Sequence, residues 1–201
     1  MNDRLLALKQ KLENVGHEAH VFDSSAQALD FLAQRLSGKS VAFGGSVTLD
    51  QIGLYERIKP LASEILWHWK EPEKSAEIFK RALNVQAYVL SANAVARTGE
   101  IVNMDGNGNR VAASIFGPEE VYFVIGRNKL TEDLASAIDR VQNIAAPLNA
   151  KRLRKSTPCA KDGKCHNCRR SDSFCCVMTI HKRRPSGIKS VVVLIDEDLG
   201  Y

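Results

Sequence analysis

The chain has 201 residues, of which 44% are hydrophobic and 25% charged, values typical of a soluble globular protein with one well-buried domain. No apolar run approaches the ~20 residues that span a bilayer, and the first ten residues lack a signal-peptide core, so we expect a cytoplasmic protein without a membrane partner. The formal net charge is +5, but it is unevenly distributed. Residues 151–189 carry 12 Lys/Arg and two acids, a local charge of +10, whereas the remaining 16 bases and 21 acids leave −5.

In chain order, apolar spacing first predicts an amphipathic helix over residues 3–15, closed by Gly16. Strands and helices then alternate. The predicted elements are a strand at 20–22, a helix at 25–36, a strand at 40–43, a helix at 49–59, a strand at 64–69, a helix at 73–84 and a strand at 87–91. This alternation predicts an α/β fold with a parallel sheet.

The pattern changes after residue 91. Residues 93–103 predict a hairpin, residues 121–126 a buried strand and residues 131–145 a helix stopped by Pro147. Two further strands, at 177–181 and 190–195, follow a cysteine-rich loop. We expect a single domain over residues 1–201, with residues 153–184 as a cysteine-rich basic segment within it.

The first candidate site is the turn that contains Gly44, Gly45, Ser46 and Thr48, between a predicted strand and helix. Glycines let a ligand approach the backbone, and free N–H groups together with hydroxyl donors favour an anion. A simple turn is the alternative interpretation.

The second candidate is the polar loop 103–110, which includes Asp105, Gly106, Asn109 and Arg110. Such a loop brings a carboxylate, amides and a guanidinium to one ligand, although glycine- and asparagine-rich loops also serve as plain connections.

The third candidate is the turn at 126–129, which places Arg127 and Lys129 directly after a buried strand. Two cations there suit a phosphate or a carboxylate, and the alternative is a solvated helix-entry loop. Because ligands gather at the carboxyl ends of parallel strands, we expect all three loops to converge on one pocket that binds a small anion.

All five cysteines fall between residues 159 and 176. Clustered thiolates in a cytoplasmic protein favour metal over disulfides, and four of them suit an iron–sulfur cluster, with zinc as the alternative. The expected ligands are Cys159, Cys165, Cys168 and Cys175, with Cys176 spare. The surrounding basic charge is interpreted as compensation for thiolates, as a contact for an acidic partner, or as a solvated loop. Nucleic acid is not expected, because only Phe174 is available for base stacking.

Taken together, these loops resemble the LUD domain, formerly DUF162, over nearly the whole chain. The matching motifs are Gly44-Gly45-Ser46-x-Thr48, the stretch from Thr98 to Ala112, Gly126-Arg127-Asn128-Lys129, the stretch from Arg140 to Arg152, Thr157-Pro158-Cys159, and the terminal Glu197-Asp198-Leu199-Gly200-Tyr201. Within the family, the sequence is most similar to the compact branch related to LutC/YkgG lactate-utilization proteins.

The resemblance implies a three-layer α/β/α sandwich like the NagB/RpiA/CoA-transferase group. It also implies a role beside iron–sulfur partners in the oxidation of L-lactate to pyruvate. Carried over by motif, the implied ligand-site positions are Gly45, Ser46, Thr48, Asp105, Asn109, Arg110 and Lys129. The resemblance fixes no catalytic base.

Three hypotheses follow. The leading one is an accessory protein of lactate oxidation with an anion pocket and a cysteine-held metal centre. The second is an independent enzyme acting on a sugar phosphate, a CoA ester or a folate-like acid, with Asp105 as base or nucleophile. The third is a non-catalytic module whose basic, metal-bearing segment docks onto an acidic redox partner. The sequence is compatible with an oligomer.

Overall fold

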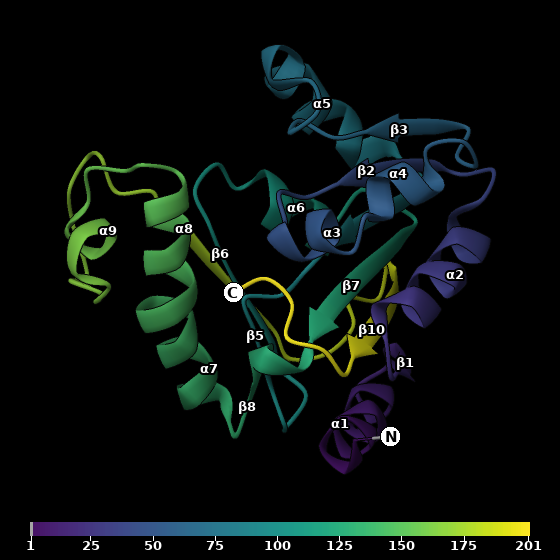
Figure 1. Cartoon of the computed structure of the whole chain (residues 1–201), viewed down its shortest axis with the longest axis horizontal. Coiled ribbons are helices and arrows are strands. Elements are labelled where there is room, and N and C mark those ends of the chain that lie inside the picture. Colours follow the sequence, from purple (N-terminus) through teal and green to yellow (C-terminus); the bar gives the residue numbers. More distant parts are fainter. Residues whose placement is uncertain (1) are drawn as a thin grey trace.

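A six-stranded parallel sheet forms the centre of the structure, a computed structural model that describes residues 2–201 (Figure 1). Its two longest strands come from continuous apolar runs, which suit strands buried on both faces. In spatial order the strands are β1 (Glu18–Phe22), β10 (Lys189–Ile195), β7 (Glu120–Gly126), β4 (Ala87–Leu90), β2 (Ser40–Phe43) and β3 (Glu64–Leu66).

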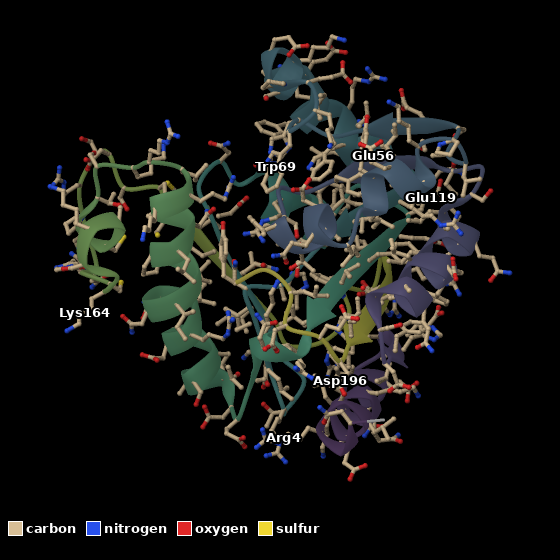
Figure 2. All side chains as sticks on the ribbon, in the orientation of Figure 1. Arg4, Glu56, Trp69, Glu119, Lys164 and Asp196 are labelled. Atoms are coloured by element: carbon tan, nitrogen blue, oxygen red, sulfur yellow. The ribbon has the colours of Figure 1, made fainter. Side chains whose placement is uncertain are left out.

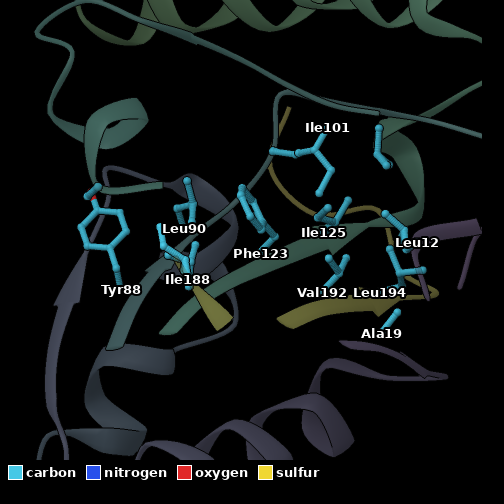
Figure 3. Packing of buried hydrophobic residues seen from close by; sticks show 14 of the residues in the cluster. Leu12, Ala19, Tyr88, Leu90, Ile101, Phe123, Ile125, Ile188, Val192 and Leu194 are labelled. Atoms are coloured by element: carbon cyan, nitrogen blue, oxygen red, sulfur yellow. The ribbon is translucent and has the colours of Figure 1, made fainter. Parts of the chain in front are cut away.

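Helices cover both faces of this sheet. Alternate residues of β10 point to opposite sides, so Val192 and Leu194 pack in one core cluster with Phe123 (Figure 3), while Val191 and Val193 pack in the other. The first cluster includes side chains of α1 (Asp3–Asn14), α5 (Ser75–Arg81) and α6 (Asn109–Ile115), and the second those of α2 (Ser25–Leu36), α3 (Val47–Gln51) and α4 (Leu54–Ile58). The predicted α/β class is confirmed.

A second, mixed sheet lies beside the first. The predicted hairpin is confirmed as the antiparallel pair β5 (Ala94–Ala96) and β6 (Ile101–Asp105). Two strands that are distant in sequence extend this pair, giving the order β8 (Leu130–Thr131), β5, β6 and β9 (Val177–His181). Helix α7 (Leu134–Arg140) packs on it through a small cluster that includes Ala137 and Val141.

The helix expected to stop at Pro147 continues past it, and this expectation was wrong. A π-helical segment, η4 (Val141–Ala145), joins α7 to α8 (Ala146–Arg152), and Pro147 occupies the first turn of α8. Proline is tolerated in the first turn of a helix because its missing N–H is not needed there. The continuation matters because it extends the helix to Arg152.

The cysteine-rich basic segment leads from α8 through α9 (Pro158–Asp162) to β9. Its far end is anchored on the 103–110 loop, because the backbone N–H of Cys176 donates to the Asp105 carbonyl oxygen over 2.9 Å. A Cβ on Gly106 would lie 2.9 Å from the carbonyl oxygen of Phe174, so a side chain there would displace the segment. The segment is therefore fixed against one of the candidate loops.

Short 3₁₀ turns complete the chain at η1 (Pro72–Lys74), η2 (Ala82–Asn84) and η3 (Arg127–Lys129). Within residues 2–201, none of the helices combines the length and the apolar character that crossing a bilayer requires.

Gly126 couples β7 to the last residues of the chain. A Cβ there would lie 2.8 Å from both the Glu197 carbonyl oxygen and the Leu199 nitrogen, at a backbone φ of −76° that any residue adopts. We therefore expect Gly126→Ala to lower the free energy of unfolding by about 2 kcal/mol through overpacking. Gly187→Ala is the matched control, because nothing lies within 4 Å of its added Cβ. Urea unfolding measures both, and equal midpoints would contradict this packing.

Candidate functional site

A cavity of about 330 Å³ opens at the carboxyl edge of the parallel sheet. Strands β2, β4 and β7 all end there because they run parallel, and β6 brings a further loop from the second sheet. The three loops singled out in the sequence meet in this one cavity. Its lining includes Gly45, Ser46 and Thr48 from the first, Asp105, Gly106, Asn109 and Arg110 from the second, and Lys129 from the third.

The two glycines after β2 make room for neighbouring side chains. A Cβ on Gly44 would lie 3.0 Å from Cγ of Arg110, and one on Gly45 would lie 3.0 Å from Nε1 of Trp69. Gly44 is therefore a packing residue beneath Arg110, outside the lining of the cavity. Helix α3, which Ser46 caps, has only five residues, so its dipole adds little attraction for an anion.

Arg110 is 9% exposed, and its guanidinium is committed to internal contacts. Nη1 donates to Oδ1 of Asn103 over 2.9 Å, and Nη2 donates to Oδ1 of Asn93 over 3.2 Å and to the Met104 carbonyl oxygen over 2.5 Å. Nε approaches Oδ1 of Asp105 at 3.4 Å. The side chain therefore holds the 103–110 loop against the connection after β4, and little of its hydrogen-bonding capacity is left for a ligand.

Asp105 is engaged by the start of α6. Its Oδ2 accepts from the backbone N–H groups of Arg110, at 3.0 Å, and Val111, at 3.4 Å, while Oδ1 faces the Arg110 guanidinium. These contacts satisfy donors at the beginning of a helix that has no capping side chain of its own. The geometry makes Asp105 an anchor for α6 and Arg110, and it occupies most of the carboxylate that a catalytic role would need.

Lys129 lies at the floor of the cavity and is only 2% exposed. Its Nζ contacts two hydroxyls, Oγ1 of Thr48 at 2.6 Å and Oγ of Ser91 at 2.8 Å. Burial lowers the pKa of this amine well below its usual value, and the nearby charges of Arg140 and Arg110 lower it further. A lysine in these surroundings is a poor receptor for an anion, because its charged form is disfavoured.

Arg127 is turned away from the cavity and does not line it. Its guanidinium forms ion pairs with Asp196, at 3.3 Å, and Asp198, at 2.9 Å, on the outside of the molecule. The exposed basic residues that do line the cavity are Arg152, at the end of α8, and Lys155 just beyond it.

The Arg152 guanidinium lies over the Trp69 ring, with Cζ 4.7 Å from the ring centroid. Its Nε donates to the Tyr201 hydroxyl over 2.8 Å, and Nη2 donates to Oδ1 of Asn149 over 2.9 Å. Among the described residues Nη1 has no hydrogen-bond acceptor. The aromatic face and the two acceptors thus orient the guanidinium and leave one edge available.

His68, which lies between Trp67 and Trp69 in the sequence, also lines the cavity. Burial lowers its pKa; Asp105 acts in the opposite sense, and Arg152 lowers the pKa further. Its Nδ1 is buried and finds no hydrogen-bond partner within residues 2–201. The ring therefore favours the neutral form at physiological pH. It both packs against its neighbours and forms part of the cavity wall.

The cysteines gather at one end of the molecule, but they do not form a ready-made metal site. Burial and, to a smaller extent, the other four sulfurs raise the pKa of the Cys175 thiol to about 11, so all five lie within electrostatic reach. The Asn167 backbone N–H points at Sγ of Cys165 over 3.4 Å. Over residues 2–201, however, no three Cys, His, Asp or Glu side chains are arranged to hold one ion, and all five cysteines are free thiols. Thiolates are suitable ligands for a soft metal, but the cysteines are not positioned around a common centre in this structure.

Comparison with known proteins agrees with this architecture. The chain resembles the crystal structure of a DUF162 family protein from Deinococcus radiodurans, with a TM-score of 0.54, 15% sequence identity and 96% of each chain covered. At this identity the likeness shows the fold alone. No curated protein matches the sequence. The model of the LUD domain matches residues 5–195, nearly the full length. The chain belongs to the LUD domain family.

Proposed function

We propose that this protein binds a small carboxylate in the cavity at the sheet edge and serves lactate utilization, the process with which the LUD family is associated. In this proposal it is an accessory subunit that works with iron–sulfur partners in the oxidation of L-lactate to pyruvate. We also propose that the sheet and the helices on its two faces form a three-layer α/β/α sandwich like that of the NagB/RpiA/CoA-transferase group. The cavity volume of about 330 Å³ accommodates an acid of this size together with bound water.

The observation that carries the proposal is the orientation of Arg152. Its guanidinium is stacked on Trp69 and hydrogen-bonded to Asn149 and Tyr201, Nη1 has no acceptor among residues 2–201, and Arg152 lines the cavity. A planar guanidinium with a free edge suits a carboxylate. The carboxylate of Asp105 in the same cavity is already matched by Arg110, so it does not cancel the attraction.

The second hypothesis, an independent enzyme on a sugar phosphate, CoA ester or folate-like acid, relied on Asp105 as base or nucleophile. The structure gives that carboxylate three N–H contacts and an anchoring role. No specific observation favours the hypothesis, and Asp105 enters the present proposal only as a structural residue.

We expect Arg152→Ala to weaken the binding of L-lactate or pyruvate about tenfold to a hundredfold. The physical reason is the loss of a charge-assisted hydrogen bond, worth roughly 1.5–3 kcal/mol. Isothermal titration calorimetry at fixed ionic strength measures the change. Arg154→Ala is the matched control, because Arg154 is exposed, carries the same charge and does not line the cavity. Equal weakening in both variants, or no binding by the unaltered protein, would contradict the proposal.

We also propose that the cysteine-rich segment takes up an iron–sulfur cluster, or zinc as the alternative, with Cys159, Cys165, Cys168 and Cys175 as ligands. The support is the soft thiol chemistry, the proximity of the five sulfurs and the surrounding cations. When bound, a cluster would supply electron transfer to an iron–sulfur partner. Because the described donors do not enclose an ion, the segment has to rearrange as metal binds.

Metal analysis of anaerobically purified protein tests this assignment. We expect bound iron and a brown colour, or one equivalent of zinc, and in either case loss of the metal in the double variant Cys165→Ser, Cys168→Ser. Cys176→Ser, which removes the spare thiol, should keep its metal. Metal-free protein, or equal metal content in all variants, would overturn the metal proposal.

A further inference from the structure

Lys129 is a buried amine without an acidic partner. Its neighbours with charge are Arg110 and Arg140, both cations, and no carboxylate of residues 2–201 is hydrogen-bonded to its Nζ. Arg140 is itself fixed, since its Nε donates to the Asn128 carbonyl oxygen over 3.1 Å. A charged ammonium in this position would be both desolvated and repelled.

The hydrogen bonds around Nζ match the two N–H groups of a neutral amine and provide no acceptor for a third. The Ser91 hydroxyl donates to the Val124 carbonyl oxygen over 2.5 Å, and the Thr48 hydroxyl donates to the Leu199 carbonyl oxygen over 3.3 Å. With their protons engaged, both hydroxyls accept from Nζ. A neutral amine has two N–H groups, so these two contacts use both and leave the nitrogen lone pair free.

Lys129 and Arg152 both line the same cavity. A carbonyl compound held by its carboxylate therefore has access to an uncharged nucleophile. Uncharged lysines desolvated in this way are the ones that attack carbonyl carbons.

We propose that Lys129 forms an imine with a 2-oxo acid whose carboxylate is bound by Arg152. This deepens the proposed function and rests on it, since pyruvate, the product of lactate oxidation, is a 2-oxo acid. The Nζ lone pair forms a bond to the carbonyl carbon and gives a carbinolamine. The carbonyl oxygen then leaves as water together with both amine hydrogens, and a C=N bond remains. No oxidant or reductant is consumed.

Reductive trapping tests the proposal directly. The full-length protein is incubated with pyruvate and sodium borohydride, whose hydride reduces the imine carbon to a stable secondary amine. Intact mass spectrometry followed by peptide mapping should find one reduced pyruvate, on Lys129. Lys129→Met should lose this adduct, and Lys80→Met, which removes an exposed surface lysine, should keep it. Mapping on the unaltered protein locates the adduct even if Lys129→Met fails to fold.

The outcomes separate this inference from the proposed function. An adduct on Lys129 whose yield falls at least tenfold at low pyruvate in Arg152→Ala supports both. An adduct on Lys129 that is unaffected by Arg152→Ala supports the imine-forming amine and overturns the carboxylate role of Arg152. Pyruvate binding by calorimetry with no adduct on Lys129, or with adducts spread over surface lysines only, overturns the imine and leaves the proposed function standing.

Discussion

The guanidinium of Arg110 is the contact on which the site depends. It joins Asn93, after the parallel sheet, to Asn103 and Asp105 on the second sheet, and it lies across Gly44. This clamp adds to the backbone contacts of Asp105 with α6 and Cys176 and helps to hold a glycine- and asparagine-rich loop in one conformation. The same charge acts at a distance on Lys129 and disfavours its protonation. Arg110 thus shapes the cavity and adds to the effects of burial and of Arg140 on Lys129.

The cavity separates two kinds of basic residue. Arg152 and Lys155 are exposed at the outer wall, whereas Lys129 is buried at the floor, in surroundings that lower the pKa of its amine. In the proposed complex, the carboxylate of a 2-oxo acid would lie toward the guanidinium and its carbonyl toward the amine. The second basic region, around the cysteines, faces outward at the far side of α8, where Figure 2 shows Lys164 beside α9.

The sequence was sufficient to predict that the loops at 44–48 and 126–129 meet, because they follow parallel, buried strands of one sheet. The loop at 103–110 reaches the same cavity from β6, an antiparallel strand of the second sheet, so the parallel-strand argument did not account for its position. The sequence was not sufficient to predict the role of each side chain. Arg127 and Lys129 are two residues apart, and only the 3₁₀ turn that contains them sends one outward and the other into the core. Arg152 was not among the predicted site residues, because its helix was expected to have ended at Pro147. The π-helical segment that carries the chain past this proline has no signal in the apolar pattern.

The charge on Lys129 is the quantity that tests this account most directly. Nitrogen NMR of protein labelled at the lysine side chains reports whether each Nζ is an amine or an ammonium. We expect a neutral amine for Lys129 at pH 7, and a change toward ammonium when Arg110 is replaced by Met in a variant that still folds. An ammonium signal for Lys129 at pH 7 in the unaltered protein would contradict it.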